Sequence, residues 1–205
     1  MKKRDFDVIV FGATSFAGQI LCRYLLTEFG TAANPGARNL SWAIAGRSQA
    51  RLDALVVELG EQAKKLSIII ADADDEPALE KLCAQTRAVV STVGPYALYG
   101  ETLVRVCSRS GTDYCDLTGE PHWVRRMITK YADEAKRSGA RIVHCCGFDS
   151  IPSDLGVWFL QQQATKQFGE PCTEVKMRVK AMRGAASGGT VASALNIVRE
   201  ASKDA

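Results

Sequence analysis

The segment Val8–Gly18, VIVFGATSFAG, constrains the fold of this chain more than any other part of the sequence. An apolar run ends at Gly12, small residues follow, and Gly18 precedes the mainly apolar segment 20–26. This order predicts a buried strand, a tight turn and the first turn of a helix. Such a turn offers unpaired backbone N–H groups and the positive end of a helix dipole, which together bind phosphate. The segment therefore predicts a dinucleotide-binding site near the start of the chain.

The glycine spacing of this turn departs from the usual G-x-G-x-x-G fingerprint. Thr14 stands at the second glycine position, and the pattern is closer to G-x-x-G-x-x-G with Ser15 in place of the middle glycine. Two glycines alone are a weak signal, so an ordinary βα turn that binds nothing is the alternative. We expect the cofactor contacts of this turn at Gly12, Ala13, Thr14, Ser15, Phe16 and Gly18.

Composition excludes several classes of protein. The 205 residues are 46% hydrophobic, which is enough for a packed core, and the net charge of +3 is too small to indicate nucleic-acid binding. No apolar run approaches the roughly 20 residues that cross a bilayer, and no signal-type cleavage site follows the N-terminus, so we expect a cytoplasmic protein. Seven cysteines without a C-x-x-C pair are typical of buried thiols, and two histidines without ligand spacing predict no metal site.

Near-continuous apolar strand patterns alternate with helix patterns through the first 150 residues. The expected strands are 6–11, 40–45, 66–71, 88–93, 112–117 and 140–146. The expected helices are 17–29, 49–59, 77–86, 100–110 and 122–138, the last one closed by Gly139. This alternation predicts an α/β fold with a doubly wound parallel sheet, covered on both faces, in the strand order 3-2-1-4-5-6.

The pattern changes after residue 150. A helix is expected over 152–168, a half-exposed strand over 173–182, a loop of small residues over 184–189, and a helix from Thr190. The chain ends at residues 203–205, apparently inside an element. We therefore expect 1–150 to be the dinucleotide-binding domain, and 151–205 to be a linker helix with the start of a second, truncated α/β domain.

The end of the second strand indicates which dinucleotide is bound. NAD-specific folds usually place Asp or Glu there to hold the ribose 2′-hydroxyl, whereas this chain has Arg47 and Ser48. A guanidinium offers a planar fork of donors to a 2′-phosphate, and Arg51 lies one helical turn further on. The alternative is an exposed arginine at a helix start, where its charge opposes the helix dipole. We therefore expect NADP(H), with Arg47 and Ser48 among its contacts.

Small and polar residues also follow the third and fourth strands, at the edge where ligands lie in such folds. Asp72 could accept a hydrogen bond from an adenine amine, or it could cap the next helix. Gly94 would permit close approach of the cofactor to the backbone, and Pro95 would stiffen the turn. We add Asp72, Ser91, Val93, Gly94 and Pro95 to the expected cofactor contacts.

Catalytic groups are less well marked. Asp116 and Glu120 follow the fifth strand and could act as acid or base, or Glu120 could cap a helix while Asp116 holds a loop. Tyr96 and Tyr99 are further weak candidates for the proton donor. Asp149 follows the sixth strand and could be close to the cofactor or purely structural.

These motifs together closely resemble the saccharopine dehydrogenase-like oxidoreductases, above all the branch that includes the trans-acting enoyl reductases. The segments that carry the resemblance are 12–18, 45–47, 91–96, 114–120 and 147–154. The resemblance implies an NADP-binding Rossmann domain followed by a second α/β domain for substrate and subunit contacts. It also implies cofactor contacts at Gly12, Thr14, Ser15, Phe16, Arg47, Ser91 and Gly94. Members are typically much longer, so most of the second domain is missing here.

Two functions follow as hypotheses. The first is an NADP(H)-dependent oxidoreductase that moves a hydride to or from a C=C or C=N bond of a small-molecule or acyl substrate, with enoyl or lipid types included. The second is a non-catalytic NADP(H)-binding sensor or scaffold module. A homodimer could form through the missing second domain, and a lipid substrate would suggest a location peripheral to a membrane.

Two other dehydrogenase classes fit the sequence poorly. Short-chain dehydrogenases use Tyr-x-x-x-Lys, and no tyrosine here has a lysine four residues later. Semialdehyde dehydrogenases need a nucleophilic cysteine with a histidine partner. Cys115 and Cys145 lie in strand-like runs, where burial raises the pKa of a thiol and lowers its reactivity.

Overall fold

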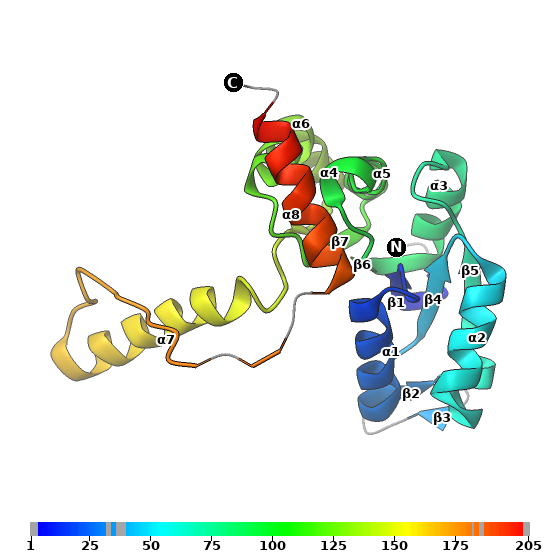
Figure 1. Cartoon of the computed structure of the whole chain (residues 1–205), viewed down its shortest axis with the longest axis horizontal. Coiled ribbons are helices and arrows are strands. Elements are labelled where there is room, and N and C mark those ends of the chain that lie inside the picture. The colour runs from blue at the N-terminus through cyan, green and yellow to red at the C-terminus, as the bar shows by residue number, and fades with distance from the viewer. Residues whose placement is uncertain (1–3, 32–33, 36–39, 182, 185–186, 203–205) are drawn as a thin grey trace.

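The computed structural model describes residues 4–31, 34–35, 40–181, 183–184 and 187–202. Six parallel strands form one sheet in the order β5-β4-β1-β6-β7-β8 (Figure 1). Their bounds are β1 Phe6–Phe11, β4 Trp42–Gly46, β5 Ser67–Ile70, β6 Thr86–Ser91, β7 Asp113–Asp116 and β8 Ile142–Val143. Counted as the six expected strands, this order is 3-2-1-4-5-6, so the predicted doubly wound sheet is confirmed.

Helices cover both faces of the sheet. They are α1 Phe16–Phe29, α2 Gln49–Leu59, α3 Glu76–Gln85, α4 Tyr96–Tyr99, α5 Glu101–Ser110 and α6 Pro121–Ser138, with the 3-10 helix η1 at Glu61–Lys65. A small antiparallel pair, β2 Gly30–Thr31 and β3 Asn34–Pro35, follows α1. Side chains of α1 and α2 pack in one cluster, so these two helices cover the same face.

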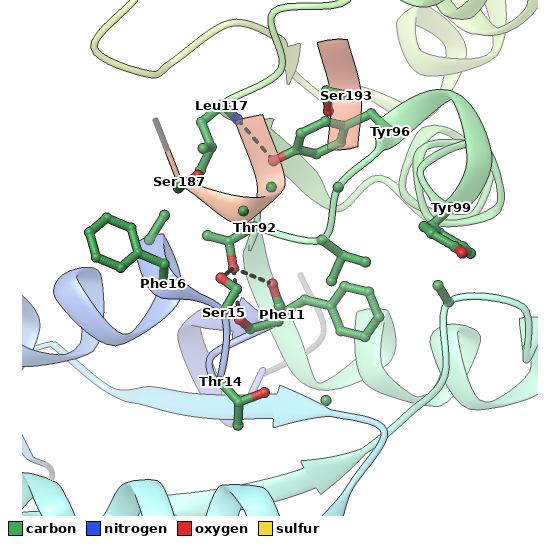
Figure 2. Close-up of a pocket in the computed structure, with 18 of the residues that line it drawn as sticks. Phe11, Thr14, Ser15, Phe16, Thr92, Tyr96, Tyr99, Leu117, Ser187 and Ser193 are labelled. Atoms are coloured by element: carbon green, nitrogen blue, oxygen red, sulfur yellow. Dashed lines mark hydrogen bonds between the residues drawn. The ribbon is translucent and has the colours of Figure 1, made fainter. Parts of the chain in front are cut away.

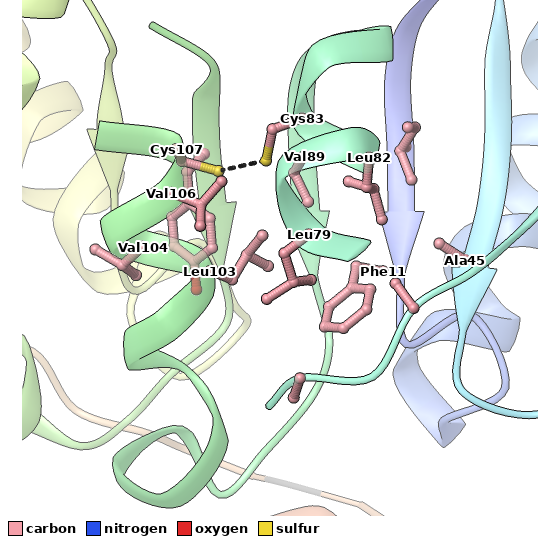
Figure 3. Packing of buried hydrophobic residues seen from close by; sticks show 14 of the residues in the cluster. Phe11, Ala45, Leu79, Leu82, Cys83, Val89, Leu103, Val104, Val106 and Cys107 are labelled. Carbon is pink, nitrogen blue, oxygen red and sulfur yellow. Dashed lines mark hydrogen bonds between the residues drawn. The ribbon is translucent and has the colours of Figure 1, made fainter. Parts of the chain in front are cut away.

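The core consists of two clusters, one on each face of β1. Val10 packs with Cys22 and Leu52 on the face of α1 and α2, whereas Ile9 and Phe11 pack on the opposite face. The second cluster joins α3 and α5, as Figure 3 shows for Leu79 and its neighbours. Because successive residues of a strand point to opposite faces, a strand buried on both faces must be apolar throughout. This explains the continuous apolar run before Gly12.

The described residues after 150 form two helices joined by an irregular segment. The helix α7, Ile151–Phe168, extends away from the sheet, and α8, Gly188–Ala201, returns to the sheet near α4 (Figure 1). The expected strand over 173–182 is wrong within the described residues 173–181, which have no regular secondary structure. A strand needs a neighbour to pair its backbone groups, and no described strand lies beside this segment. Residues 182, 185–186 and 203–205 of the expected elements lie outside the described part.

Within the residues that the structure describes, no helix combines enough length with enough apolar character to cross a bilayer.

Candidate nucleotide-binding site

A cavity of 690 Å³ lies at the carboxyl ends of β1, β4, β5 and β6. The chain runs from β1 through β4 to β5 on one side and returns to β6 on the other side of β1, so the order of strands reverses between β1 and β6. Ligands of open α/β sheets bind at such a reversal. Figure 2 shows residues from β1, α1, the loop after β6 and α8 around this cavity.

The first turn is held by the hydroxyl of Ser15, which caps α1. Its Oγ accepts a hydrogen bond of 3.0 Å from the N–H of Gly18 and donates one of 2.9 Å to Thr92 Oγ1. Thr92 Oγ1 in turn donates to the carbonyl of Gly12 at 2.8 Å (Figure 2). Because α1 begins at Phe16, its first N–H groups have no partner within the helix and are left for a ligand. Ser15 therefore acts here as a helix cap in the place of a middle glycine.

Gly12 and Gly18 are required by close packing. Gly12 has φ +85°, and a Cβ there would lie 2.6 Å from Val93 Cγ2. A Cβ on Gly18 would lie 2.4 Å from the carbonyl oxygen of Gly12. Gly12 lines the cavity, whereas Gly18 and the fully buried Ala13 do not. Gly18 thus lets the helix approach the turn, and the structure does not bring Gly18 or Ala13 to the cavity wall.

Two arginines of the cavity wall follow β4, Arg47 directly after the strand and Arg51 in the first turn of α2. Arg47 and Arg51 both line the cavity and are exposed, and neither guanidinium forms an ion pair within the described residues. Ser48 does not line the cavity, because its hydroxyl caps α2 by accepting from the N–H of Arg51 at 3.4 Å. Since α2 begins with its own cap satisfied, the two arginines are free to meet an anion.

The end of β5 brings Asp72 to the cavity wall. Its carboxylate accepts from the N–H of Asp74 at 3.4 Å, while Asp75 caps α3 by accepting from Ala78 at 3.1 Å. The capping alternative for Asp72 is therefore wrong.

The loop after β6 contributes Thr92, Val93 and Gly94 to the cavity. Ser91 and Pro95 are buried behind it, with the Ser91 carbonyl accepting from the Tyr96 hydroxyl at 3.0 Å. The Gly94–Pro95 peptide bond is cis. Sequence reasoning missed Thr92, although a threonine directly before Val93-Gly94 offered a hydroxyl at the position where the sheet order reverses.

Three of the four candidate acid or base groups are buried and engaged. Burial raises the pKa of Tyr96 well above its usual range, and the nearby Asp116 carboxylate adds to this effect. Glu120 is fully buried, and its carboxylate accepts from the N–H groups of Tyr96 at 2.9 Å and Ala97 at 3.0 Å, so it caps α4. Asp116 is 1% exposed and holds the loop that follows it. Neither carboxylate lines the cavity. Asp116 holds a loop, as the structural alternative has it, whereas the Glu120 side chain does not cap α6, the helix that follows it, and accepts instead from the start of α4.

Tyr99 and Asp149 differ from these buried groups. Both line the cavity and both are exposed, Tyr99 to 41%. Tyr96 also lines the cavity, but its hydroxyl is engaged by Ser91 and Leu117, so Tyr99 and Asp149 are the candidates after β6 and β8 whose polar groups can meet a ligand directly.

The helix α8 closes one side of the cavity, which sequence reasoning did not anticipate. Ser187 caps it by accepting from the N–H of Thr190 at 3.2 Å, and residues 187–190 line the cavity. Ser193 donates to Glu120 Oε1 at 2.9 Å, which ties α8 to α4. The run of Ser, Gly, Gly and Thr was the available signal, since small residues before a helix permit close approach to a ligand.

Cysteine and metal chemistry find no support among the described residues. Burial raises the pKa of Cys115 to about 12 and raises the pKa of Cys145 above its usual value, as expected. All seven cysteines are free thiols. No group of three or more His, Cys, Asp or Glu side chains in the described part could hold a metal ion.

Comparisons with known proteins agree with this architecture. Residues 8–143 match the model of the saccharopine dehydrogenase NADP binding domain. A protein of Mycobacterium tuberculosis named putative trans-acting enoyl reductase is 43% identical over 201 residues, which are 98% of this chain and 46% of that protein. A trans-acting enoyl reductase of Mycobacterium bovis is 41% identical over 204 residues, 98% of this chain and 47% of its own length. The chain thus spans about half the length of these relatives.

The comparison with a solved structure supports the fold alone. Apo saccharopine dehydrogenase from Saccharomyces cerevisiae superposes with a TM-score of 0.59 at 22% identity, covering 78% of this chain and 32% of that chain.

Proposed function

This chain belongs to the family of the saccharopine dehydrogenase NADP-binding domain, and from that premise we propose that the 690 Å³ cavity holds NADP(H). The pyrophosphate would lie against the N-terminus of α1, where Gly12 leaves room for it and the N–H groups of Phe16 and Ala17 have no partner within the helix. Thr14, Ser15, Phe16, Val93 and Gly94 complete the proposed contacts.

The observation that carries this proposal is the pair of free guanidiniums at the end of β4. Arg47 and Arg51 line the cavity beside Gly46, and no carboxylate stands at this strand end. A carboxylate would repel a 2′-phosphate, whereas an arginine binds it with two parallel hydrogen bonds. The residues present therefore fit NADP(H) better than NAD(H).

We further propose that the whole protein is an oxidoreductase, with a C=C bond as the hydride acceptor and a C=N bond as the second choice. Bound NADP(H) supplies the hydride chemistry, and the chain supplies orientation and a proton. The names of the relatives, trans-acting enoyl reductases, support an enoyl or other acyl substrate. Tyr99 is our proposed proton donor, since its side chain is exposed on the cavity wall.

A non-catalytic NADP(H) sensor or scaffold is the second candidate. This function is favoured because the carboxylates of Asp116 and Glu120 both accept structural hydrogen bonds. Assay of a chain of the relatives' full length with NADPH and an enoyl thioester separates the two functions. Oxidation of NADPH that depends on the thioester supports the enzyme, whereas binding without oxidation supports the sensor or scaffold.

Two further proposals concern the partners of the protein and its location in the cell. We propose a homodimer formed through the part of the relatives that this chain does not span, and a cytoplasmic protein that reaches a membrane surface if its substrate is a lipid. Sedimentation of the longer chain tests the first point, and flotation with lipid vesicles tests the second.

Calorimetry with NADPH and NADH tests the binding site directly. We expect micromolar affinity for NADPH, a loss of about tenfold or more in Arg47→Ala, and no change for NADH in that variant. Arg125→Ala, an exposed arginine on α6 away from the cavity, is the matched control. Equal affinities for the two dinucleotides, or an equal loss in both variants, would overturn the proposal.

A further inference from the structure

A second cavity, of 290 Å³, lies between α5, α6 and β8 and shares no lining residue with the first. Its wall is mainly apolar. The residues that form it are Val104, Ser108, Met127, Ile128, Tyr131, Ala132, Ala135, Lys136, Ala140, Ile142 and His144. Ile128 and Ala132 are exposed on α6, so the cavity reaches the surface there. Cavities of this kind take small, largely apolar molecules.

Two polar atoms in the wall are buried without a partner. Ser108 is fully buried, the side chain of His144 is 6% exposed, and neither Ser108 Oγ nor His144 Nε2 has a hydrogen-bond partner among the described residues. Buried polar groups of native proteins are nearly always hydrogen-bonded, so each such atom requires an explanation. Their presence in one cavity points to a ligand that carries a polar group.

The hydrogen bonds of Asp116 decide what His144 offers to this cavity. Asp116 accepts from the N–H groups of Thr118 at 3.1 Å and Cys145 at 3.0 Å, and from the Tyr114 hydroxyl at 3.0 Å. Its Oδ2 also lies 2.6 Å from His144 Nδ1. A carboxylate with this set of donors holds the imidazole proton on Nδ1. In the singly protonated ring with this tautomer, the Nε2 atom presents a lone pair, which accepts a hydrogen bond.

Contacts with two aromatic side chains also fix the position of the His144 ring. The ring of His144 meets Trp123 edge-on at a centroid distance of 5.0 Å and Tyr114 at 5.8 Å. Because Trp123 and Tyr114 are both buried in the core, their contacts hold the imidazole in this orientation. A preformed acceptor in an apolar wall selects a ligand with a donor group.

We propose that this cavity is a second ligand site, for a neutral molecule with an apolar body and one hydroxyl group that donates to His144 Nε2. An apolar cavity of about 150 Å³ holds benzene, so this one suits a ligand of about ten non-hydrogen atoms. This site is independent of the NADP(H) site, because the two cavities have separate walls.

Calorimetry with 4-propylphenol tests the proposal, and 4-propylanisole is the matched probe without a donor. We expect saturable binding of the phenol, at least tenfold weaker binding of the anisole, and the same phenol affinity with NADPH in excess. The ¹⁵N chemical shift of His144 Nε2 should move with the phenol only. Equal binding of both probes would overturn the proposal, as would no saturable binding of either, which would mean that the cavity holds water only.

A variant at the opening of the cavity tests where the ligand binds. Ala132→Phe adds a ring at an exposed position of α6 and should abolish binding of the phenol. Arg125→Phe adds the same ring to the same helix outside the cavity and should leave the affinity unchanged. Thermal unfolding confirms that both variants fold. Full phenol affinity in a folded Ala132→Phe variant would contradict the assignment.

Discussion

The hydroxyl of Ser15 donates a hydrogen bond of 2.9 Å to the hydroxyl of Thr92, although 77 residues separate them in the chain. The first residue caps the helix after β1, and the second follows β6, so the bond joins the two sides of the sheet reversal. The Thr92 hydroxyl in turn donates a hydrogen bond to the carbonyl of Gly12. The turn proposed to hold the pyrophosphate is thus fastened to the loop on the far side of the cavity.

Replacing Thr92 by valine should weaken NADPH binding about tenfold, because Ser15 loses an acceptor and the Gly12 carbonyl loses a donor. The side chain keeps its volume, so the loss reports the hydrogen bonds. Calorimetry with NADPH measures it. Thr92→Ser keeps the hydroxyl and should bind nearly as well as the original chain; an unchanged affinity in Thr92→Val would show that the link does not position the turn.

Replacing Gly12 by alanine should abolish NADPH binding and destabilise the fold by about 2 kcal/mol. The added Cβ would meet Val93 Cγ2 at 2.6 Å, in addition to the strain of φ +85°. Gly60→Ala is the control, because Gly60 has φ +90° but nothing lies within 4 Å of its Cβ position. Urea unfolding of the two variants separates the clash from the strain, and equal losses of stability would contradict the role of close packing at Gly12.

Glu120→Gln should lower the free energy of unfolding by about 2 kcal/mol while NADPH affinity changes little. The buried carboxylate accepts from the N–H groups of Tyr96 and Ala97 and from the Ser193 hydroxyl, and an amide nitrogen cannot accept from any of them. Urea unfolding and calorimetry provide the two measurements. A large loss of enoyl reduction in the full-length chain, without a loss of stability, would instead make Glu120 catalytic.

Asp113→Asn should destabilise the protein by about 1 kcal/mol at pH 7, and the difference should shrink in acid. Hydrogen bonds from Arg141 lower the pKa of Asp113 below its usual value in the folded state. The unfolded carboxyl titrates near pH 4, so this stabilisation is present above about pH 4 and is lost as the pH falls through the lower folded pKa. Urea unfolding at several pH values measures it.

The control for this prediction is Asp133→Asn, which removes an exposed carboxylate on α6. Its effect on the free energy of unfolding should be small and should not follow the pH profile of Asp113→Asn. Parallel profiles for the two variants would mean that net charge, and not the contact with Arg141, causes the effect.

Local sequence patterns predicted most of the sheet. The apolar run before Gly12 forms β1, and the alternation of strand and helix patterns led to the correct order of six strands. The pattern also placed Arg47 at the end of its strand, beside the cavity. These predictions succeed because the strands are buried on both faces and the crossovers have one hand, so composition and spacing leave few arrangements.

Predictions that depended on distant contacts succeeded less often. Asp72 does not cap α3, because Asp75 occupies the cap position. Asp116 accepts hydrogen bonds from three donors and also contacts His144. The strand expected over 173–182 alternates correctly, but no neighbouring strand pairs with its described residues. The alternation of apolar and polar side chains shows which residues share one face of a segment, but it does not show which other element packs against that face.

The sequence by itself determined that this chain is a parallel α/β domain with a glycine-containing turn after the first strand and an arginine at the second strand end, because each feature depends on neighbouring residues. Only the tertiary structure decided that Thr92 fastens that turn, that α8 closes the cavity, and that His144 faces a second cavity. Those contacts join residues far apart in the chain, and they exist because packing of the sheet brings strand ends to one edge and helices to its faces.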